Sequence, residues 1–256
     1  MKKILSFDSI GSYTQKKSIL EEFNNICVTG GFFRRGKAYF RVVGDGVLQV
    51  LKFERESTRC VPCLSVGLFS MYGELQRQWF TSNGCIPRYN IVTLENHDSP
   101  QVMPSAKECT VYGTISPDAQ LDVLKKKGLP WLNSITTQVQ LVSQICALDV
   151  LRYKKVIWND LEKYAPYLYS GDRTSAIKVI EAILEQHRFA IERSRSYLSP
   201  EEFDRYCLQS DEEDSGLRAK KVLAENGDIS AIQSYLEANY KRNFDYAKFC
   251  LKNMGE

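Results

Sequence analysis

The spacing of apolar residues changes along the chain, and the change predicts where a helix gives way to strands. Ile19, Phe23 and Ile26 recur at helical spacing after Thr14, and the glycines at 30–31 follow as a stop signal. From Tyr39 onward the pattern alternates with period two, on both sides of the GDG turn at 44–46. The sequence therefore predicts a leading helix and then a β-hairpin over residues 38–54.

The second strand of this hairpin is apolar on both faces. Val47 and Leu51 fall on one face, and Leu48 and Val50 fall on the other. A strand with two apolar faces is typical of the middle of a sheet. Further strands are predicted at 63–72, 89–95 and 110–115, which together give an antiparallel-type sheet.

Helical signals resume at Ser116 and continue to the end of the chain. Ser116 and Pro117 are typical of a helix start, and the lysines at 125–127 suit the negative end of its dipole. Later helices are predicted over 131–151 and around 158–168, with three more beyond; Asp172, the capping box Ser199–Glu202 and Asp228 mark their starts. The predicted fold class is α+β, with a domain over 1–130 and a helical extension over 131–256.

Residues 14 to about 150 resemble a mostly bacterial family catalogued as domain of unknown function 4304. The resemblance rests on the leading amphipathic helix, the stretch GFFRRGKAYFRVVGDGVLQVLKFE, the following LSVGLF, and KKKGLPWL at the end of the unit. It implies an α+β domain and implies no active-site residue.

Composition places the chain among ordinary globular proteins and leaves its partner open. It has 256 residues, of which 43% are hydrophobic and 25% charged. Lys and Arg outnumber Asp and Glu by 17 to 12 in residues 1–128, a modest excess that permits nucleic-acid binding without favouring it. The apolar run in the opening MKKILSF, Ile4 and Leu5, is too short for an export signal. Elsewhere no apolar run approaches the roughly 18 residues of a membrane span. We therefore expect no membrane association, a cytoplasmic location and reduced thiols.

One stretch combines cations with aromatic rings around the predicted hairpin. Its candidate binding residues for an anion or a single-stranded nucleic acid are Arg34, Arg35, Lys37, Tyr39 and Arg41. The alternative is structural: the aromatic rings anchor the hairpin in the core, and the cations occupy its solvent face. We favour the structural interpretation.

Other residues capable of chemistry have simpler structural interpretations. Cys60 and Cys63 have C-x-x-C spacing but lead into a strand and lack a second close pair, so we expect packed thiols and no metal. His97 lies in the polar loop 95–99, whose composition is that of a turn. His187 falls between apolar residues at helical spacing, which favours a structural histidine, and the acidic run 211–214 favours a solvated surface.

The sequence leads to a hypothesis of a non-enzymatic binding protein that needs no cofactor. Its partner is unknown, and the helical half is the region we expect to contact another protein. Two alternatives stay open. The first is nucleic-acid binding through the basic hairpin, and the second is an enzyme whose site is assembled from residues distant in sequence.

Overall fold

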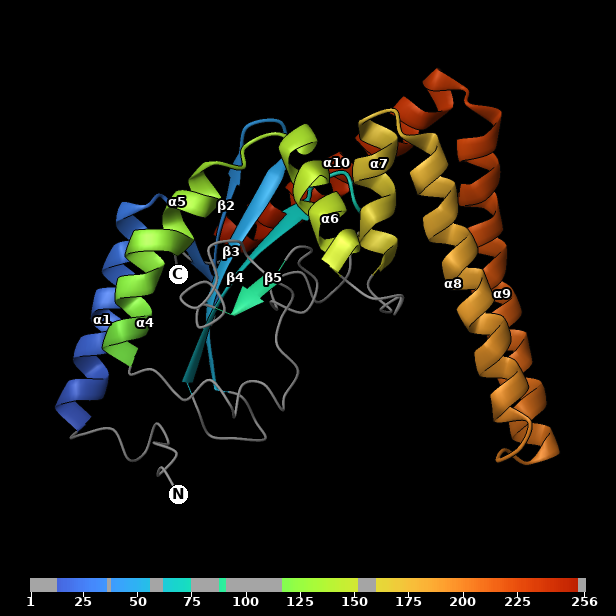
Figure 1. The fold of residues 1–256 in the computed structure, drawn as a ribbon, viewed down its shortest axis with the longest axis horizontal. Coiled ribbons are helices and arrows are strands. Elements are labelled where there is room, and N and C mark those ends of the chain that lie inside the picture. Colours follow the sequence, from blue (N-terminus) through green and yellow to red (C-terminus); the bar gives the residue numbers. More distant parts are fainter. Residues whose placement is uncertain are drawn as a thin grey trace.

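A computed structural model describes residues 13–35, 38–55, 62–74, 88–90, 117–151 and 160–252. It has the α+β arrangement that the sequence predicts: a leading helix, an antiparallel sheet and then helices only (Figure 1). The leading helix α1 spans Tyr13–Thr29, which confirms the first predicted element.

The sheet is an antiparallel meander in which each strand pairs with the next along the chain. Its strands are β1 (Phe33–Arg35), β2 (Ala38–Val43), β3 (Val47–Arg55), β4 (Pro62–Ser70) and β5 (Arg88–Asn90), in spatial order β1-β2-β3-β4-β5. The predicted hairpin is confirmed, with Phe40 opposite Val50. The predicted strand at 63–72 is confirmed as β4, while residues 91–95 and the strand predicted at 110–115 lie outside the described residues.

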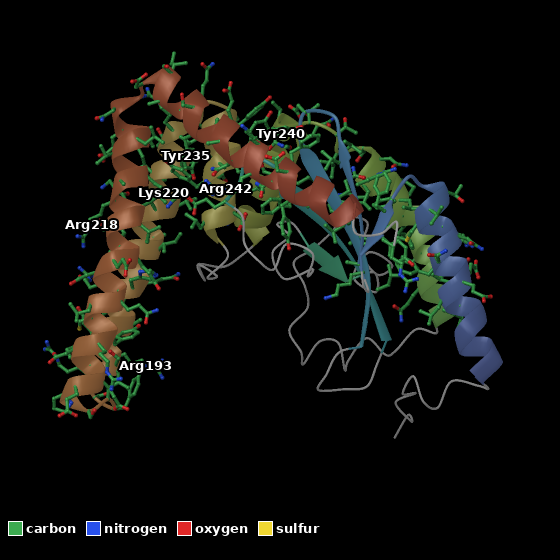
Figure 2. The ribbon with its side chains drawn as sticks, turned by 180° about the vertical axis from the view of Figure 1, so that it is seen from behind. Arg193, Arg218, Lys220, Tyr235, Tyr240 and Arg242 are labelled. Carbon is green, nitrogen blue, oxygen red and sulfur yellow. The ribbon has the colours of Figure 1, made fainter. Side chains whose placement is uncertain are left out.

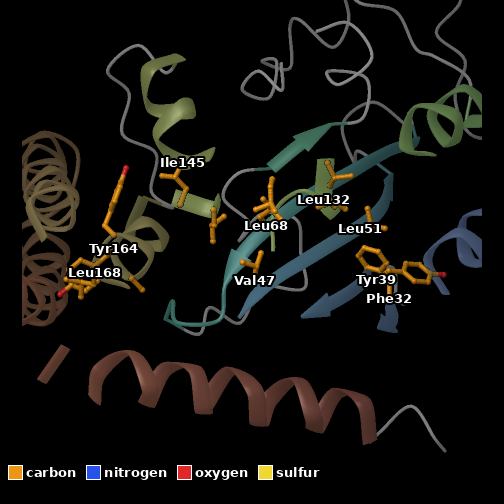
Figure 3. Close-up of a cluster of buried hydrophobic side chains, with 14 of the residues drawn as sticks. Phe32, Tyr39, Val47, Leu51, Leu68, Leu132, Ile145, Tyr164 and Leu168 are labelled. Carbon is orange, nitrogen blue, oxygen red and sulfur yellow. The ribbon is translucent and has the colours of Figure 1, made fainter. Parts of the chain in front are cut away.

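Two layers of helices cover the two faces of the sheet. Val47 and Leu51 of β3 pack with α1 and the helices of residues 117–151, whereas Leu48 and Val50 pack on the opposite face with Ala247 of the last helix. The last helix, α10 (Ile229–Lys252), runs beneath the sheet in Figure 3. The central position predicted for the second hairpin strand is therefore confirmed.

The helices between the sheet and the C-terminal half are shorter than the sequence pattern indicates. They are α4 (Pro117–Val123), a π-helical turn η3 (Leu124–Gly128), α5 (Leu129–Asn133) and α6 (Gln138–Leu151). The prediction of one helix over 131–151 is wrong, because the chain leaves the helix at Ser134 and starts a new one at Gln138.

Side chains from the sheet explain this break. Gln49 is fully buried in β3, and its Nε2 donates to the carbonyls of Leu132 (2.6 Å) and Ile135 (3.0 Å). Asp45, in the hairpin turn, accepts a hydrogen bond from the backbone N–H of Gln138 at 2.8 Å. The sheet thus supplies partners for backbone groups that the broken helix leaves unpaired.

The C-terminal half is helical throughout its described residues. Its elements before α10 are the 3₁₀ turn η4 (Asp160–Lys163), α7 (Tyr164–Tyr169), α8 (Arg173–Ser194) and α9 (Pro200–Asn226). The predicted caps are confirmed: Asp172 accepts from Ser175 N, Ser199 and Glu202 form the capping box, and Asp228 accepts from Ser230 N and Ala231 N. Among these helices none has the length and apolar character needed to cross a membrane.

The hydrophobic core continues across the boundary predicted near residue 130. One cluster joins Leu51 and Leu68 of the sheet to Leu141, Leu168 and Ile180 of later helices. The division into units 1–130 and 131–256 stays a prediction. Because the core is shared, separating the chain at residue 130 would test it.

Candidate functional site

The basic hairpin brings the predicted binding residues onto two neighbouring strands. Arg34 and Arg35 belong to β1, while Tyr39 and Arg41 belong to β2; Lys37 lies outside the described residues. β1 pairs only with β2 in the described sheet, so it is an edge strand there. The environments of the individual side chains decide whether these residues can bind a ligand.

Tyr39 anchors the leading helix to the sheet. The side chain is buried, its hydroxyl donates to Asn24 Oδ1 at 2.9 Å, and its ring meets Phe23 edge to face at 5.1 Å. Burial raises the pKa of this phenol above its ordinary value. A ring enclosed in this way does not offer a face for stacking a base, so Tyr39 supports the structural interpretation.

Arg41 is half-buried, and its guanidinium is hydrogen-bonded within the protein. Its guanidinium lies 4.3 Å from the centre of the Phe32 ring, and its Nε donates to Gln49 Oε1 at 2.8 Å. Its terminal nitrogens donate to the Gly30 carbonyl and to Asn133 Oδ1. Arg41 therefore ties the end of α1, the centre of the sheet and the end of α5 together.

Arg34 and Phe33 of β1 are exposed in the structure. Phe33 is 50% exposed, and the Arg34 guanidinium lies 5.8 Å from the centre of the Tyr39 ring. Phe32 and Phe40 are buried, as the structural interpretation expects. The hairpin thus divides into a buried aromatic part and a short exposed edge.

A buried polar junction, which sequence reasoning missed, lies where the turn after β4 meets the helical half. Glu162 of η4 is only 5% exposed, and its Oε2 has no hydrogen-bond partner within the part of the chain that the structure describes. A Cβ placed on Gly73 would lie 3.0 Å from this oxygen, so the turn and the carboxyl are in close contact. Burial, and secondarily the charge of Glu74, hold the pKa of Glu162 well above its ordinary value.

Glu74 connects the same turn to α9 and α10. Its Oε1 lies 3.0 Å from Lys220 Nζ and accepts a hydrogen bond of 3.0 Å from the Tyr235 hydroxyl. Lys220 and Tyr235 are among the residues labelled in Figure 2. The Tyr164 hydroxyl donates to the Lys220 carbonyl at 2.6 Å, and burial raises the pKa of both tyrosines. Lys220 is thus paired with Glu74, the carboxyl nearer to α9 and α10.

Two asparagines of α10 complete the junction. Asn239 Nδ2 donates to the Tyr72 carbonyl, and Asn243 Nδ2 donates to the carbonyls of Met71 (2.7 Å) and Gly73 (2.8 Å). Asn243 Oδ1 is buried and has no partner within the described ranges. The turn at 71–74 is thus held from both sides by polar side chains, two of which keep an unpaired acceptor oxygen.

Helices α8 and α9 form a long antiparallel hairpin that extends away from the sheet (Figure 1). Ile180, Ile183 and Leu217 are buried within it near its base. Further out, His187 Nδ1 lies 2.7 Å from Asp214 Oδ1, with both residues buried. The prediction of a structural histidine is confirmed, whereas the prediction of a solvated acidic run is wrong for Asp214, the partner of that histidine.

The outer face of α9 carries a stripe of apolar and small residues. Leu208, Ser215 and Val222 are spaced by seven residues, and Ala219 lies between the last two on the same face. All are exposed, Leu208 by 71%. The residues that pack against α8 lie on the opposite face, so this stripe plays no part in holding the hairpin together.

The remaining candidates gain no chemical role from the structure. Cys60 and the 95–99 loop lie outside the described residues, and Cys63 is part of β4. Lys125 forms an ion pair with Glu22 of α1 at 2.5 Å. Within the described ranges, no group of three or more His, Cys, Asp or Glu side chains could hold a metal ion.

Comparison of the chain with protein-family models, with curated proteins and with solved structures found no match. The resemblance to the family catalogued as domain of unknown function 4304 therefore stays a prediction.

Proposed function

We propose that this protein is a non-enzymatic binding protein whose α9 stripe, defined by Leu208, Ser215, Ala219 and Val222, docks a helix of a partner protein. The observation that carries the proposal is the exposure of this stripe on a helical hairpin that does not cover the sheet. A bacterial origin and a cytoplasmic location stay predictions of the same hypothesis.

The spacing of the stripe suits a helical partner. Positions seven residues apart form the seam along which two helices pack, and small residues in the middle let the two backbones approach closely. Gly216 borders the stripe in its middle, and a Cβ there would lie 4.0 Å from the flexible end of Lys220. Glu212 lies within the stripe, seven residues before Ala219, and would need a polar or basic partner there. Arg218 borders the stripe and would belong to the polar rim of the contact.

The two alternatives have less support. Arg41 and Tyr39 are engaged inside the protein, which leaves the exposed edge around Phe33 and Arg34 as the described basis for nucleic-acid binding. For an enzyme, Glu162 has the raised pKa of a candidate general acid, but its 5% exposure leaves a substrate without access.

Site-specific photocross-linking in living cells tests the proposal. A photoreactive amino acid is placed in turn at Leu208, Ser215 and Val222, and at two exposed controls off the stripe, Phe189 of α8 and Val139 of α6. We expect the three stripe positions to give one adduct of the same mass, because they would face the same partner helix. The controls should not give that adduct.

A second variant separates docking from folding. Leu208→Glu with Val222→Glu should remove the adduct formed from position 215, while the free energy of unfolding changes by no more than about 0.5 kcal/mol per exposed site. Equal adducts from stripe and control positions, or no adduct from any stripe position, would contradict the proposed function.

A further inference from the structure

Among the residues that the structure describes, none is recorded as balancing a negative charge on the buried carboxyl of Glu162. Lys220 is paired with Glu74 at 3.0 Å, and Glu74 itself is a second acid near Glu162. Burying a carboxylate without a counter-ion is strongly unfavourable, because the charge loses its hydration. Such a group either takes up a proton or acquires a counter-ion.

Geometry favours the proton over a metal ion. The turn passes so close that a Cβ on Gly73 would lie 3.0 Å from Glu162 Oε2 and 3.2 Å from the ring of Phe69. A hard cation needs about six oxygen ligands and room for them, and within the described residues no group of three or more His, Cys, Asp or Glu side chains could hold one. A proton needs no additional space.

The position of the carboxyl gives its protonation a structural consequence. Glu162 belongs to η4, directly before α7, and it faces the 71–74 turn at the end of the sheet. The charged group that acts on it from the turn is Glu74. Glu74 in turn contacts Lys220 of α9 and Tyr235 of α10, and its charge also acts on Tyr164 of α7. Lys163, the next residue of η4, is buried as well.

We propose that Glu162 is a proton-operated latch between the sheet and the helical half. In its neutral form it packs against the turn at Gly73 and holds η4 and α7 in place. Ionisation places a buried negative charge near that of Glu74, which loosens the attachment of the helices to the turn. The attachment of the α8–α9 hairpin to the sheet then depends on pH.

The sign of the pH dependence follows from proton linkage. The pKa of Glu162 is higher in the folded chain than in the unfolded chain, so between these two values the folded state binds more protons. Stability is therefore lost as pH rises through that window. Below the ordinary glutamate pKa both states are protonated, and the carboxyl contributes no pH dependence.

The neutral isostere Glu162→Gln tests the latch. Urea unfolding is measured at pH 5, 6, 7 and 8 and constant ionic strength for the wild type, for Glu162→Gln and for Glu237→Gln, an exposed carboxyl of α10. We expect the unfolding constant of the wild type, relative to that of Glu162→Gln, to rise severalfold from pH 5 to pH 8, because the folded chain still holds a proton that the unfolded chain has lost. Glu237→Gln should follow the wild type.

Hydrogen exchange of the wild type provides a readout that needs no variant. After correction for intrinsic rates, amides of residues 71–74, 160–169 and 235–243 should gain exchange at pH 8 relative to pH 6, while β3 amides should not. Parallel pH profiles for wild type and Glu162→Gln would overturn the latch. Stabilisation of the wild type, but not of Glu162→Gln, by millimolar Ca²⁺ or Mg²⁺ would also overturn it, because a cation would then balance the carboxylate.

Discussion

Two hairpins of this protein, β2–β3 and α8–α9, differ in what surrounds them. Helices lie on both faces of the β2–β3 hairpin, and a Cβ on either glycine of its turn would meet Thr136 or Tyr240. The α8–α9 hairpin packs on α7 and η4 as well as on itself, and its turn at 195–199 is largely exposed. Arg41 and Asp45 of the first hairpin form hydrogen bonds within the fold, whereas the outer face of α9 is available to a partner.

Separating the chain at residue 130 should have the largest effect. Fragment 1–130 lacks α10, which covers Phe40, Leu48 and Val50 on one face of the sheet, and lacks most of the helices on the other. We expect this fragment to lack a cooperative unfolding transition and to bind a hydrophobic dye, since both faces lose their cover.

Shortening the α8–α9 hairpin is the matched control for that separation. Replacing residues 188–213 with a short Gly/Ser linker keeps His187 beside Asp214 and removes only the outer part. This variant should retain cooperative unfolding in a circular dichroism experiment. A 1–130 fragment that unfolds cooperatively would support the predicted domain boundary. A shortened chain that does not fold would show that the outer part of the α8–α9 hairpin is needed for folding.

The next effect in size is expected at the turn of the β-hairpin. Gly44 has φ +53°, and a Cβ there would lie 1.8 Å from the Thr136 carbonyl oxygen. Gly44→Ala should therefore cost about 3 kcal/mol of unfolding free energy, by backbone strain and overpacking. Gly216→Ala, on the exposed face of α9, should instead stabilise the protein by about 0.5–1 kcal/mol. Urea denaturation measures the change in the free energy of unfolding for each variant. Equal changes would show that the two hairpins are similarly enclosed.

The sequence predicts what depends on local periodicity and capping. Alternation around residues 38–54 predicts the β-hairpin, and Asp172, Ser199 and Asp228 each start a helix as their local chemistry indicates. The break at 134–137 was not predictable in this way, because it depends on Gln49 and Asp45, which lie about 90 positions earlier in the chain.

The buried polar residues also depend on long-range contacts that the local sequence does not predict. Asp214 belongs to an acidic run whose first three members are exposed, and only its pairing with His187 of another helix buries it. Glu162 and Glu74 are brought together by the fold, and neither has a neighbour in sequence that signals a shared site. The burial of Asp214 and Glu162 depends on contacts between elements distant in the sequence, which a local sequence pattern does not reveal.

The smallest expected difference is between two arginines of the basic stretch. Arg41→Gln removes the contact with Phe32 and leaves the Gln49 acceptor buried without its donor, which should cost about 1–3 kcal/mol of unfolding free energy. Arg34→Gln changes an exposed side chain and should cost no more than about 0.5 kcal/mol. Both free energies of unfolding are measured by urea denaturation.

The same pair of variants tests the nucleic-acid alternative, because an Arg34 contact with phosphate would appear as salt-sensitive affinity. We expect single-stranded DNA to bind wild type and Arg34→Gln equally weakly, with dissociation constants above roughly 10⁻⁵ M near physiological salt. A submicromolar, salt-sensitive complex that Arg34→Gln weakens would show instead that the edge strand β1 is the binding surface.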